Sequence, residues 1–451
     1  MEKTSSTETY QHQEIAHTVP GMAVPSQWAE KGSQIYIEGA GSKLWAIDGK
    51  EYLDATSCGL TNNIGYGNKE LAETAKEQMI KLYHVPNFGG RVGLPYIALS
   101  KKLAEISPMD RFLVENSGSE VVDAAFKVAR LYWREKGLDK YKIISLERAY
   151  HGVTFGALST MGVPMFKCPG FEPLVPGFSA IPSPYCYLCP LGKTYPGCDI
   201  DCAQALEEAI EKEGEDSVAA FIGEPVQGGG GCIVPPPEYW PKVREICTKH
   251  NVLLIIDEVI TGFGRTGKFW GHEHWGIKPD LMTMAKGLAC GYVPISALGM
   301  TEEIYKGITQ SDNPFLHIHT FGGHSVACAV ALKNLEIMER ENLTERAAKM
   351  GAYYQERMAE IKDKSPYVGD ARGIGMWGRL QLVADKRTKE CFDPEKQVGF
   401  QLVGRILSEK QILVGSFGND IVMAGPPLTC TKEEIDAVVD AFEWALAGIE
   451  P

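Results

Sequence analysis

The middle of the chain alternates short aliphatic runs with helical stretches, and this alternation limits the fold more than any other feature. The runs read RFLVENSG, KIISLE, VAAFIGEP, VLLIIDEV, DLMTMAKG and PISALGMT. Between them lie stretches such as SEVVDAAFKVARLYWREKG and PEYWPKVREICTKHN, whose length and end residues are typical of helices. Strands that alternate with helices favour a mostly parallel sheet covered on both faces. The sequence therefore predicts an α/β fold.

The length of the chain and the character of its two ends predict a second, smaller unit. A chain of 451 residues is too long for one compact core. Residues 35–54 predict short strands joined by turns, and a mixed strand and helix segment closes the chain. We expect a large domain over residues 70–330 and a small α+β domain built from residues 1–69 and 331–451.

Charge and hydropathy exclude some classes of function. The net charge of −13 argues against a general binder of nucleic acid or of anionic membranes. No apolar run is long enough to span a bilayer, and the start MEKTSSTETYQHQEIAHTV has no hydrophobic signal core. We expect a cytoplasmic protein whose cysteines are mostly reduced and buried.

The stretch LLIIDEVITGFGRTGKFWG, residues 253–271, carries two competing glycine signatures. Its glycines fit the dinucleotide pattern G-x-G-x-x-G, and Gly262–Lys268 fits most of a nucleotide-binding P-loop. Both patterns need a context that is missing, because no helical period follows and Phe269 stands where a P-loop needs Ser or Thr. The sequence favours a supporting loop beside a site. Arg265 in this loop and Asp280 after it are expected to serve only in structural ion pairs.

Polar residues that follow several of the predicted strands carry the stronger signal. Asp257, Lys286 and Glu224 each end an aliphatic run, and the turn Ser117–Ser119 lies between a strand and a helix. Ligands of parallel sheets bind at the carboxyl ends of the strands, so these groups meet if the strands are neighbours. Tyr150, in LERAYHG, is an aromatic side chain at the end of another predicted strand.

Together these residue types describe a pyridoxal phosphate (PLP) site. A helix N-terminus offers free backbone N–H groups to a phosphate, and Lys286 beside an apolar strand loses its proton more readily and can form a Schiff base. A buried Asp257 needs a cationic partner such as a protonated pyridine nitrogen, and Tyr150 can stack on a planar ring. Taken singly, each residue has a commoner structural explanation, as a helix cap, a salt-bridge partner, a solvated lysine or a core aromatic.

Long motifs in a fixed order extend this interpretation to most of the chain. NSGSE, AYHG, GEPVQG, LLIIDEVITGFGRTG, DLMTMAKGLACGYVPISA and HTFGGHSVACAVAL occur in this order over about residues 20–448. In these motifs the chain resembles the class III (omega-type, fold-type I) aminotransferases. The resemblance implies a fold-type I PLP transferase, with a large domain whose mostly parallel sheet has seven strands and a smaller α+β domain from both termini.

The resemblance also implies roles for individual residues. Lys286 matches the lysine that forms the Schiff base and moves the proton, and Asp257 matches the carboxylate that keeps the pyridine protonated. Val259 would pack beneath the ring, and Thr320 matches a threonine that reaches the phosphate of the other subunit, which implies a homodimer with shared active sites. The cofactor-binding residues implied in this way are Ser117, Gly118, Ser119, Tyr150, His151, Glu224, Asp257, Val259, Lys286 and Thr320.

The chain departs from its relatives on the substrate side. Leu60 stands where many amine–pyruvate members carry a tryptophan, which leaves room for a bulkier or non-aromatic substrate. Gly-Ser-Phe at 415–417 stands where many relatives carry an arginine that binds a substrate carboxylate. Arg372 is the remaining candidate for that contact, and a backbone-packing role fits it equally well. The amino acceptor therefore stays open.

A cysteine-rich segment, YCYLCPLGKTYPGCDIDC, is a second departure. Cys186 and Cys189 are separated by two residues, and Cys198 and Cys202 by three. Four thiolates in such a loop can hold zinc, although the second spacing is unusual and a reduced surface insertion explains the segment as well. In neither case is a metal expected in the catalytic site.

These observations predict a PLP-dependent aminotransferase with a ping-pong mechanism. An ω- or β-amino compound such as β-alanine, taurine, a diamine or a 3-aminoacyl thioester gives its amine to a 2-oxo acid such as pyruvate or 2-oxoglutarate. One alternative is another PLP reaction on the same fold, namely an aminomutase, racemase or decarboxylase. A different alternative is a nucleotide-dependent enzyme built on the glycine loop. The expected partners are small-molecule substrates and further copies of the chain, in a homodimer or a tetramer. No nucleic acid or membrane is expected as a partner.

Overall fold

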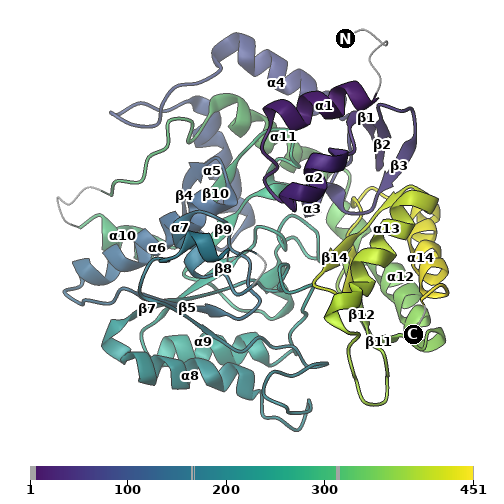
Figure 1. The fold of residues 1–451 in the computed structure, drawn as a ribbon. Helices are drawn as coiled ribbons and strands as arrows, with labels where there is room; N and C mark the ends of the chain where they lie inside the picture. Colours follow the sequence, from purple (N-terminus) through teal and green to yellow (C-terminus); the bar gives the residue numbers. More distant parts are fainter. Residues whose placement is uncertain (1–6, 164–165, 167, 311–314, 450–451) are drawn as a thin grey trace.

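A seven-stranded sheet forms the centre of the computed structural model, which describes residues 7–163, 166, 168–310 and 315–449 (Figure 1). Its strand order is β4-β10-β9-β8-β7-β5-β6. All neighbouring strands pair in parallel except β10, which is antiparallel to both β4 and β9. The strands are β4 (Arg111–Glu115), β5 (Lys142–Leu146), β6 (Phe178–Ile181), β7 (Val218–Gly223), β8 (Leu253–Asp257), β9 (Leu281–Met284) and β10 (Ser296–Met300).

This sheet confirms the predicted α/β class. The six aliphatic runs all form strands, and β6, for which the sequence analysis gave no prediction, completes the sheet at one edge. The sequence pattern did not reveal the reversed direction of β10, because an aliphatic run reads the same in either direction.

Helices cover both faces of the sheet because successive strand residues point to opposite sides. On β7, Ala220 and Ile222 pack in one apolar cluster with α6, whereas Phe221 packs in another with α8 and α9. The helices around the large sheet are α4 (Lys69–Leu82), α5 (Leu94–Ile106), α6 (Gly118–Glu135), α7 (Phe155–Ser159), α8 (Asp201–Glu213), α9 (Tyr239–Lys249), α10 (Glu302–Ile308) and α11 (Ser325–Arg340).

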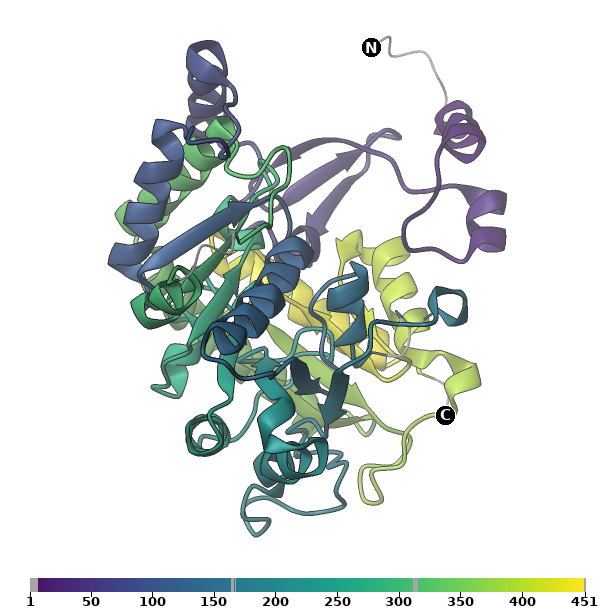
Figure 2. The same cartoon turned by 90° about the vertical axis from the view of Figure 1, so that its left-hand side faces the viewer.

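Two smaller sheets lie beside the large sheet (Figures 1 and 2). The first combines strands from the N-terminal and C-terminal parts of the chain, and the second contains only C-terminal strands. In the first, β13 from the C-terminal part pairs in parallel with β3 from the N-terminal part. Its strands are β1 (Tyr36–Ala40), β2 (Lys43–Ala46), β3 (Glu51–Asp54) and β13 (Ile412–Leu413). The second contains β11 (Val368–Gly373), β12 (Gly378–Leu382), β14 (Gly415–Phe417) and β15 (Ile421–Ala424).

The remaining helices are α1 (Thr7–His17), α2 (Pro25–Lys31), α3 (Ser57–Leu60), α12 (Leu343–Lys364), α13 (Val398–Lys410) and α14 (Lys432–Leu446). The pairing of β3 with β13 agrees with a unit made from both termini. The exact domain boundaries after residues 69 and 330 stay predictions, and residues 1–6 lie outside the described part of the chain.

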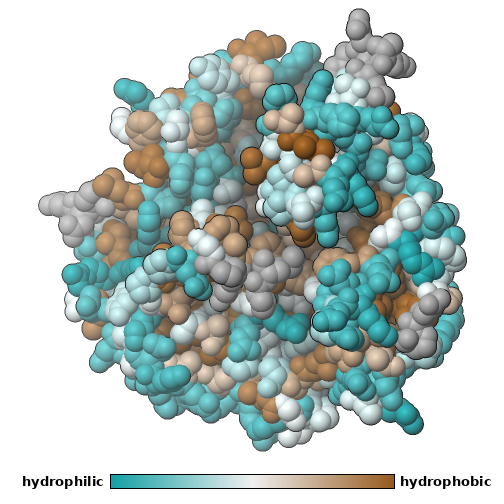
Figure 3. Space-filling view, in the orientation of Figure 1, coloured by the Kyte–Doolittle hydropathy of each residue, from teal (hydrophilic) through white to brown (hydrophobic). Residues whose placement is uncertain are grey.

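One continuous apolar core joins the large sheet to the C-terminal helices. It runs from Met282 and Met284 on β9 through α11 to Phe442 on α14, and all three side chains are buried. The C-terminal segment is therefore packed firmly against the end of the sheet where β8 and β9 finish. No helix among the described residues is both long and apolar enough to cross a membrane, and hydrophilic and hydrophobic side chains are interspersed on the face in Figure 3.

Candidate active site

The carboxyl ends of neighbouring strands enclose a cavity of about 150 Å³. Asp257 ends β8, Glu224 directly follows β7, and Lys286 follows β9 by two residues. Because β7, β8 and β9 are adjacent and parallel, their ends meet at one edge of the sheet. The cavity is lined by Gly118, Ser119, Tyr150, His151, Gly152, Glu224, Asp257, Val259, Ile260, Ala285 and Lys286.

Asp257 is held in place by two hydrogen bonds. Its Oδ1 accepts the backbone N–H of Val259 at 3.0 Å, and its Oδ2 lies 2.7 Å from Nδ1 of His151, which donates to it. Asp257 is 3 % exposed, and Nε2 of His151 is buried without a partner in the described residues. Burial acts to lower the pKa of His151, but the hydrogen bond and the charge of Asp257 outweigh it and raise that pKa. The two hydrogen bonds hold the negative charge of the Asp257 carboxylate in a fixed position at the cavity.

Lys286 faces this charge from the end of β9. Burial lowers the pKa of Lys286 to about 8, although the carboxylates of Asp257 and Glu224 act in the opposite direction. Its backbone has a φ of +41°, a left-handed value that costs a residue with a side chain about 1–3 kcal/mol. Such strain collects at functional sites because the surrounding packing holds it there. An amine with a pKa this close to neutrality can both hold and release a proton.

Glu224 is a second buried carboxyl at the cavity. It is 4 % exposed and accepts the backbone N–H groups of Tyr150 at 3.0 Å and Gly228 at 2.7 Å. Burial raises the pKa of Glu224 to about 7; His151 acts to lower it, and the charge of Asp257 raises it further. Near neutral pH this group is therefore poised between its acid and its base form.

The N-terminus of α6 closes the cavity on another side. The hydroxyl of Ser117 accepts the backbone N–H of Glu120, and the side chain of Glu120 accepts the N–H of Ser117, which makes a capping box. The N–H groups of Gly118 and Ser119 belong to the first helical turn, which has no partner within a helix. Gly152 approaches closely, since a Cβ there would lie 2.2 Å from Oγ of Ser119. The result is a narrow cradle of N–H groups suited to an anion.

A larger cavity of about 450 Å³ adjoins the first one and shares Tyr150, Ile260 and Lys286 with it. Lys286 is the only charged side chain among the described residues that line it. Trp377 contributes a buried indole N–H that has no hydrogen-bond partner in the described structure. The lining consists of Thr56, Gly59, Leu60, Tyr150, Phe166, Gly228, Gly229, Ile260, Lys286, Trp377, Gly415, Phe417, Met423, Ala424 and Gly425.

The structure brings most of the predicted site residues together and leaves three outside both cavities. Ser117 serves as the helix cap, and Arg372 on β11 lies 3.4 Å from the carboxylate of Asp370. Thr320 is exposed, with its carbonyl oxygen accepting a hydrogen bond from the ring of His84. Arg372 lines neither cavity, and its contact with a substrate carboxylate stays a prediction.

The expected structural ion pairs are half correct. Asp280 pairs with Arg244 at 2.8 Å. The prediction for Arg265 was wrong, because its guanidinium has no carboxylate partner among the described residues. It donates to the carbonyls of Met376 and Pro426 and to the side chain of Asn63. Burial lowers the pKa of Arg265 to about 10. Sequence spacing does not distinguish a carboxylate partner from backbone carbonyls that arrive from the C-terminal segment.

The glycine loop after Asp257 has a structural role, as its sequence context indicated. Within residues 262–275 the chain forms turns and a short 3-10 helix (Gly271–His274), so no α-helix N-terminus faces a ligand. Glu258 is fully buried and accepts the N–H groups of Gly271 and His272, which ties the loop back to the end of β8. A Cβ on Gly267 would lie 3.0 Å from Cα of Ala348, so this glycine permits close packing on α12.

The four cysteines of the 186–202 segment line one small cavity of about 20 Å³. All four are free, and burial raises the pKa of the Cys202 thiol to about 12. No three of these sulfur atoms, all of which are described, lie within 4.8 Å of one another. The four thiols line one cavity, and zinc binding by this segment stays a prediction.

Comparison with known proteins gives this site its family. The model of the family Aminotransferase class-III matches residues 26–446. The chain belongs to this family. A taurine–pyruvate aminotransferase of Bilophila wadsworthia is 39% identical over 430 residues, which cover 92% of each chain. A putrescine–pyruvate aminotransferase of Pseudomonas aeruginosa is 37% identical over 427 residues, covering 94% of this chain and 92% of the relative.

The fold of this class III aminotransferase matches solved structures equally well. An (S)-enantioselective omega-transaminase from Thermomicrobium roseum is 41% identical, covers 98% of this chain and 99% of its own, and superposes with a TM-score of 0.94. The protein is a fold-type I transaminase of the omega type, and its cofactor is PLP.

The residues of the inner cavity fit that cofactor. The amide cradle of α6 suits its phosphate, buried Asp257 suits a protonated ring nitrogen, and Lys286 suits its aldehyde carbon. Sequence reasoning named Leu60 and residues 415–417 on the substrate side but missed other side chains that line the outer cavity. Phe166, Trp377 and Met423 carry no motif and come from distant segments, so no signal in the sequence could have grouped them.

Proposed function

We propose that this aminotransferase takes its amino group from an ω-amine with an apolar carbon chain and passes it to a small 2-oxo acid such as pyruvate. The outer cavity carries the proposal. It offers about 450 Å³ in front of Lys286 and presents almost only apolar side chains and glycines. A donor that fills it gains from the burial of apolar surface, at about 25 cal/mol for each Å² removed from water.

Donors with an anionic group close to the amine are disfavoured by the same lining. The carboxylate of β-alanine and the sulfonate of taurine each lie two carbons from the amine. Among the described lining residues Lys286 is the only cation, and Gly415 and Phe417 line the cavity where many relatives carry an arginine. Burying an unpaired anion there would be costly. Monoamines with a longer carbon chain, whose carbons next to the amine are apolar, fit better.

The lining of the outer cavity also bears on which oxo acid accepts the amino group. The single carboxylate of pyruvate is bonded directly to the reacting carbon, closer than in β-alanine or taurine, and we propose that neutral donors of the lining, the indole N–H of Trp377 and the hydroxyl of Tyr150, bind it there. The second carboxylate of 2-oxoglutarate would need a further cation, and none of the described lining residues supplies one. We therefore propose pyruvate, or another oxo acid with a single carboxylate, as the preferred acceptor.

The inner cavity supports the proposed catalytic roles. Bound PLP makes the C–H bond beside the donor amine acidic, because its ring accepts the electron pair. Lys286, with a pKa near 8, takes up that proton at Nζ and returns it on the other side of the transfer. Asp257 holds the ring nitrogen in its protonated form, and His151 positions Asp257 through the 2.7 Å hydrogen bond. The phosphate would be oriented by Gly118 and Ser119, and the ring by Val259 and Tyr150.

A panel of amines tests the proposal. Cofactor absorbance is followed after single donors are added without acceptor, and again with pyruvate or 2-oxoglutarate. We expect monoamines of increasing chain length to react faster than putrescine, β-alanine and taurine, and pyruvate to outperform 2-oxoglutarate. A preference for taurine or β-alanine would contradict the argument from the cavity. An aminomutase, racemase or decarboxylase would turn over its substrate without any oxo acid, which the same panel detects.

We also propose a homodimer in which Thr320 of one chain completes the site of the other. Thr320 is exposed, and Leu316, Ile318 and Phe321 around it are 68%, 51% and 61% exposed. Apolar exposure on one short segment is typical of a surface that a partner covers. Chains with Lys286→Ala and chains with Thr320→Ala can be mixed to test this. Shared sites predict that mixed dimers regain activity, whereas independent sites predict none.

A further inference from the structure

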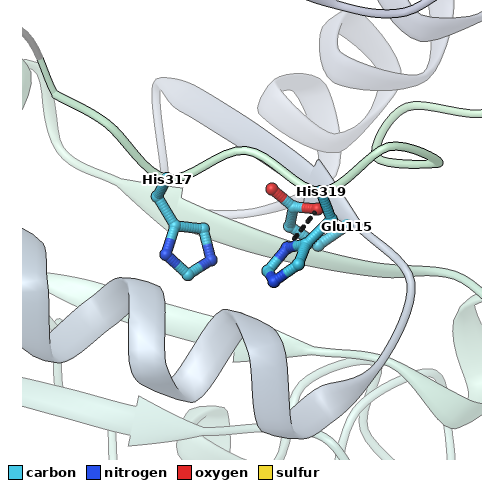
Figure 4. A group of neighbouring side chains, drawn as sticks. All are labelled: Glu115, His317 and His319. Atoms are coloured by element: carbon cyan, nitrogen blue, oxygen red, sulfur yellow. Dashed lines mark hydrogen bonds and ion pairs between the residues drawn. The ribbon is translucent and has the colours of Figure 1, made fainter.

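Two histidines and a glutamate gather at the amino-terminal side of the α6 cradle (Figure 4). Glu115 is the last residue of β4, and His317 and His319 lie two residues apart on the extended segment that leads to Thr320. Residues spaced by two on an extended chain project to the same side. One ligand atom from each of the three side chains lies within 4.8 Å of the others, and Nδ1 of His319 is 3.0 Å from Oε2 of Glu115.

His317 is the unusual member of this group. It is 7% exposed, and neither of its ring nitrogens has a hydrogen-bond partner in the described structure. The backbone of Glu120 lies close enough to act on the ring but completes no hydrogen bond with it. Leaving a buried imidazole unpaired costs about 1–3 kcal/mol. The neutral form of an imidazole carries a nitrogen lone pair and is the form that binds metal ions.

The surroundings of the cluster favour a cation. Glu115 is 2% exposed, and the carboxylates of Glu120 and Asp123 on α6 also act on the two histidines. Lys127 is the one ammonium group that acts on the cluster and opposes them. Three carboxyl groups thus lie near the two imidazoles among the described residues. Oδ1 of Asp123 is also buried without a partner among the described residues.

The backbone is shaped around the Glu115 carboxylate. A Cβ at position 322 would lie 2.6 Å from Oε2 of Glu115, so the glycine there leaves room for the carboxylate. The ring centroids of His317 and His319 lie 4.9 Å apart. The unpaired imidazole of His317 therefore lies close to both the His319 ring and the Glu115 carboxylate.

We propose that Glu115, His317 and His319 bind a divalent transition-metal ion, with Zn²⁺ as the best fit. Two imidazoles and one carboxylate are a common zinc ligand set, and water supplies the fourth position. On binding, the ring proton of His319 moves from Nδ1 to Nε2 by exchange with water, and the ion takes its place between Nδ1 and the Glu115 carboxylate. The ion links the segment that carries Thr320 to the end of β4, directly before the phosphate cradle. This site is independent of the transamination chemistry.

Zinc stoichiometry of the PLP-loaded enzyme tests the proposal. The protein is stripped with a chelator, exposed to a small excess of zinc chloride and desalted, and zinc is then measured per chain. We expect about one Zn²⁺ per chain for the wild type, as for a three-ligand site. His317→Gln and His319→Gln should each weaken binding by more than about 100-fold, since loss of even an outer partner costs 10–100-fold. Zinc should also raise the melting temperature of the wild type, but not that of His317→Gln or His319→Gln.

Two control variants make the result decisive. His324→Gln removes a histidine of the same segment that stacks on His84 instead, and it should keep the zinc. A variant with all four cysteines of the 186–202 cluster changed to serine should keep it as well. Zinc retention that survives both His317→Gln and His319→Gln, or that disappears with the cysteines, would overturn the proposal. So would a wild type that retains almost no zinc while its cofactor content and melting temperature show a folded enzyme.

Discussion

Gly152→Ala should weaken cofactor binding through a steric conflict that the structure locates. A Cβ at this position would lie 2.2 Å from Oγ of Ser119 and 2.8 Å from its Cα. The contact with the hydroxyl could be relieved by rotating that side chain, but the contact with Cα could not. Without that rotation, restoring 3.0 Å from Oγ moves the first turn of α6 by about 3.0 − 2.2 = 0.8 Å. With the rotation, which breaks the hydrogen bond from the N–H of Val153 to Oγ, the contact with Cα still requires about 3.0 − 2.8 = 0.2 Å.

The size of the effect follows from that displacement. The N–H groups of Gly118 and Ser119 would shift away from the phosphate, and misplacing such groups by about 1 Å can cost about 100-fold. We therefore expect the dissociation constant for PLP to rise by roughly 10- to 100-fold, about 1.4–2.7 kcal/mol. The backbone φ of +123° adds a separate strain of about 1–3 kcal/mol, which lowers the stability of the protein with or without cofactor.

Gly137→Ala is the matched control because it separates strain from steric conflict. Gly137 has a φ of +77°, is exposed, and has open space where a Cβ would be. It should lose stability, by about 1–2 kcal/mol, with no change in PLP affinity. Equilibrium dialysis gives the affinity, and thermal unfolding with and without added PLP gives the stability. If Gly152→Ala behaves like Gly137→Ala in both measurements, the cradle does not depend on this close approach.

Three further predictions concern charge and the outer cavity. Burial raises the pKa of Glu224 from 4.5 to about 7, so the folded, cofactor-free protein holds this proton more tightly than the unfolded chain does. The stability that comes from the protonated Glu224 is fully present below pH 4.5 and is lost as the pH rises to 7. Chemical unfolding of wild type and Glu224→Gln should show the wild type losing up to about 3 kcal/mol relative to the variant over that range, and a constant difference would refute the shift. Leu60→Trp should cut kcat/KM for bulky donors by about 10-fold or more and spare small ones, as changes in pocket size do; equal losses for both would mean that Leu60 does not shape the cavity. Trp377→Phe should raise the KM for pyruvate by at least about 10-fold, because a hydrogen bond to a carboxylate is lost, while the rate of the amine half-reaction is unchanged; a slower amine half-reaction would place Trp377 on the donor side.

The fold and the catalytic groups could be predicted from the sequence because their signals are local. A run such as VLLIIDEV contains a complete strand and the polar residue that ends it, and parallel strands place such residues at one edge. Asp257, Lys286 and Glu224 were grouped in this way, and the structure brings all three to one cavity. The N-cap at Ser117 also follows from a four-residue pattern, since the capping box needs only Ser117 and Glu120.

Features that depend on partners far away in the chain could not be predicted. The guanidinium of Arg265 donates to the carbonyls of Met376 and Pro426, which lie more than a hundred residues later in the chain. No residue near Arg265 in the sequence indicates these partners. Arg372 was named because arginine binds carboxylates, but its place on β11 beside Asp370 was set by the pairing of that strand. The reversed β10 belongs to the same class, because strand direction depends on topology.

The division between local and distant signals coincides with a division in the enzyme itself. The inner cavity is built from strand ends of the large sheet, whereas Leu60, Trp377 and Met423 of the outer cavity come from the segments that form the smaller sheets. Only Tyr150, Ile260 and Lys286 line both. Substitutions in the outer wall can therefore change which amine fits without moving Asp257 or the phosphate cradle. This arrangement explains why the reaction can be inferred from motifs, while the donor has to be argued from the shape and charge of a cavity that no motif describes.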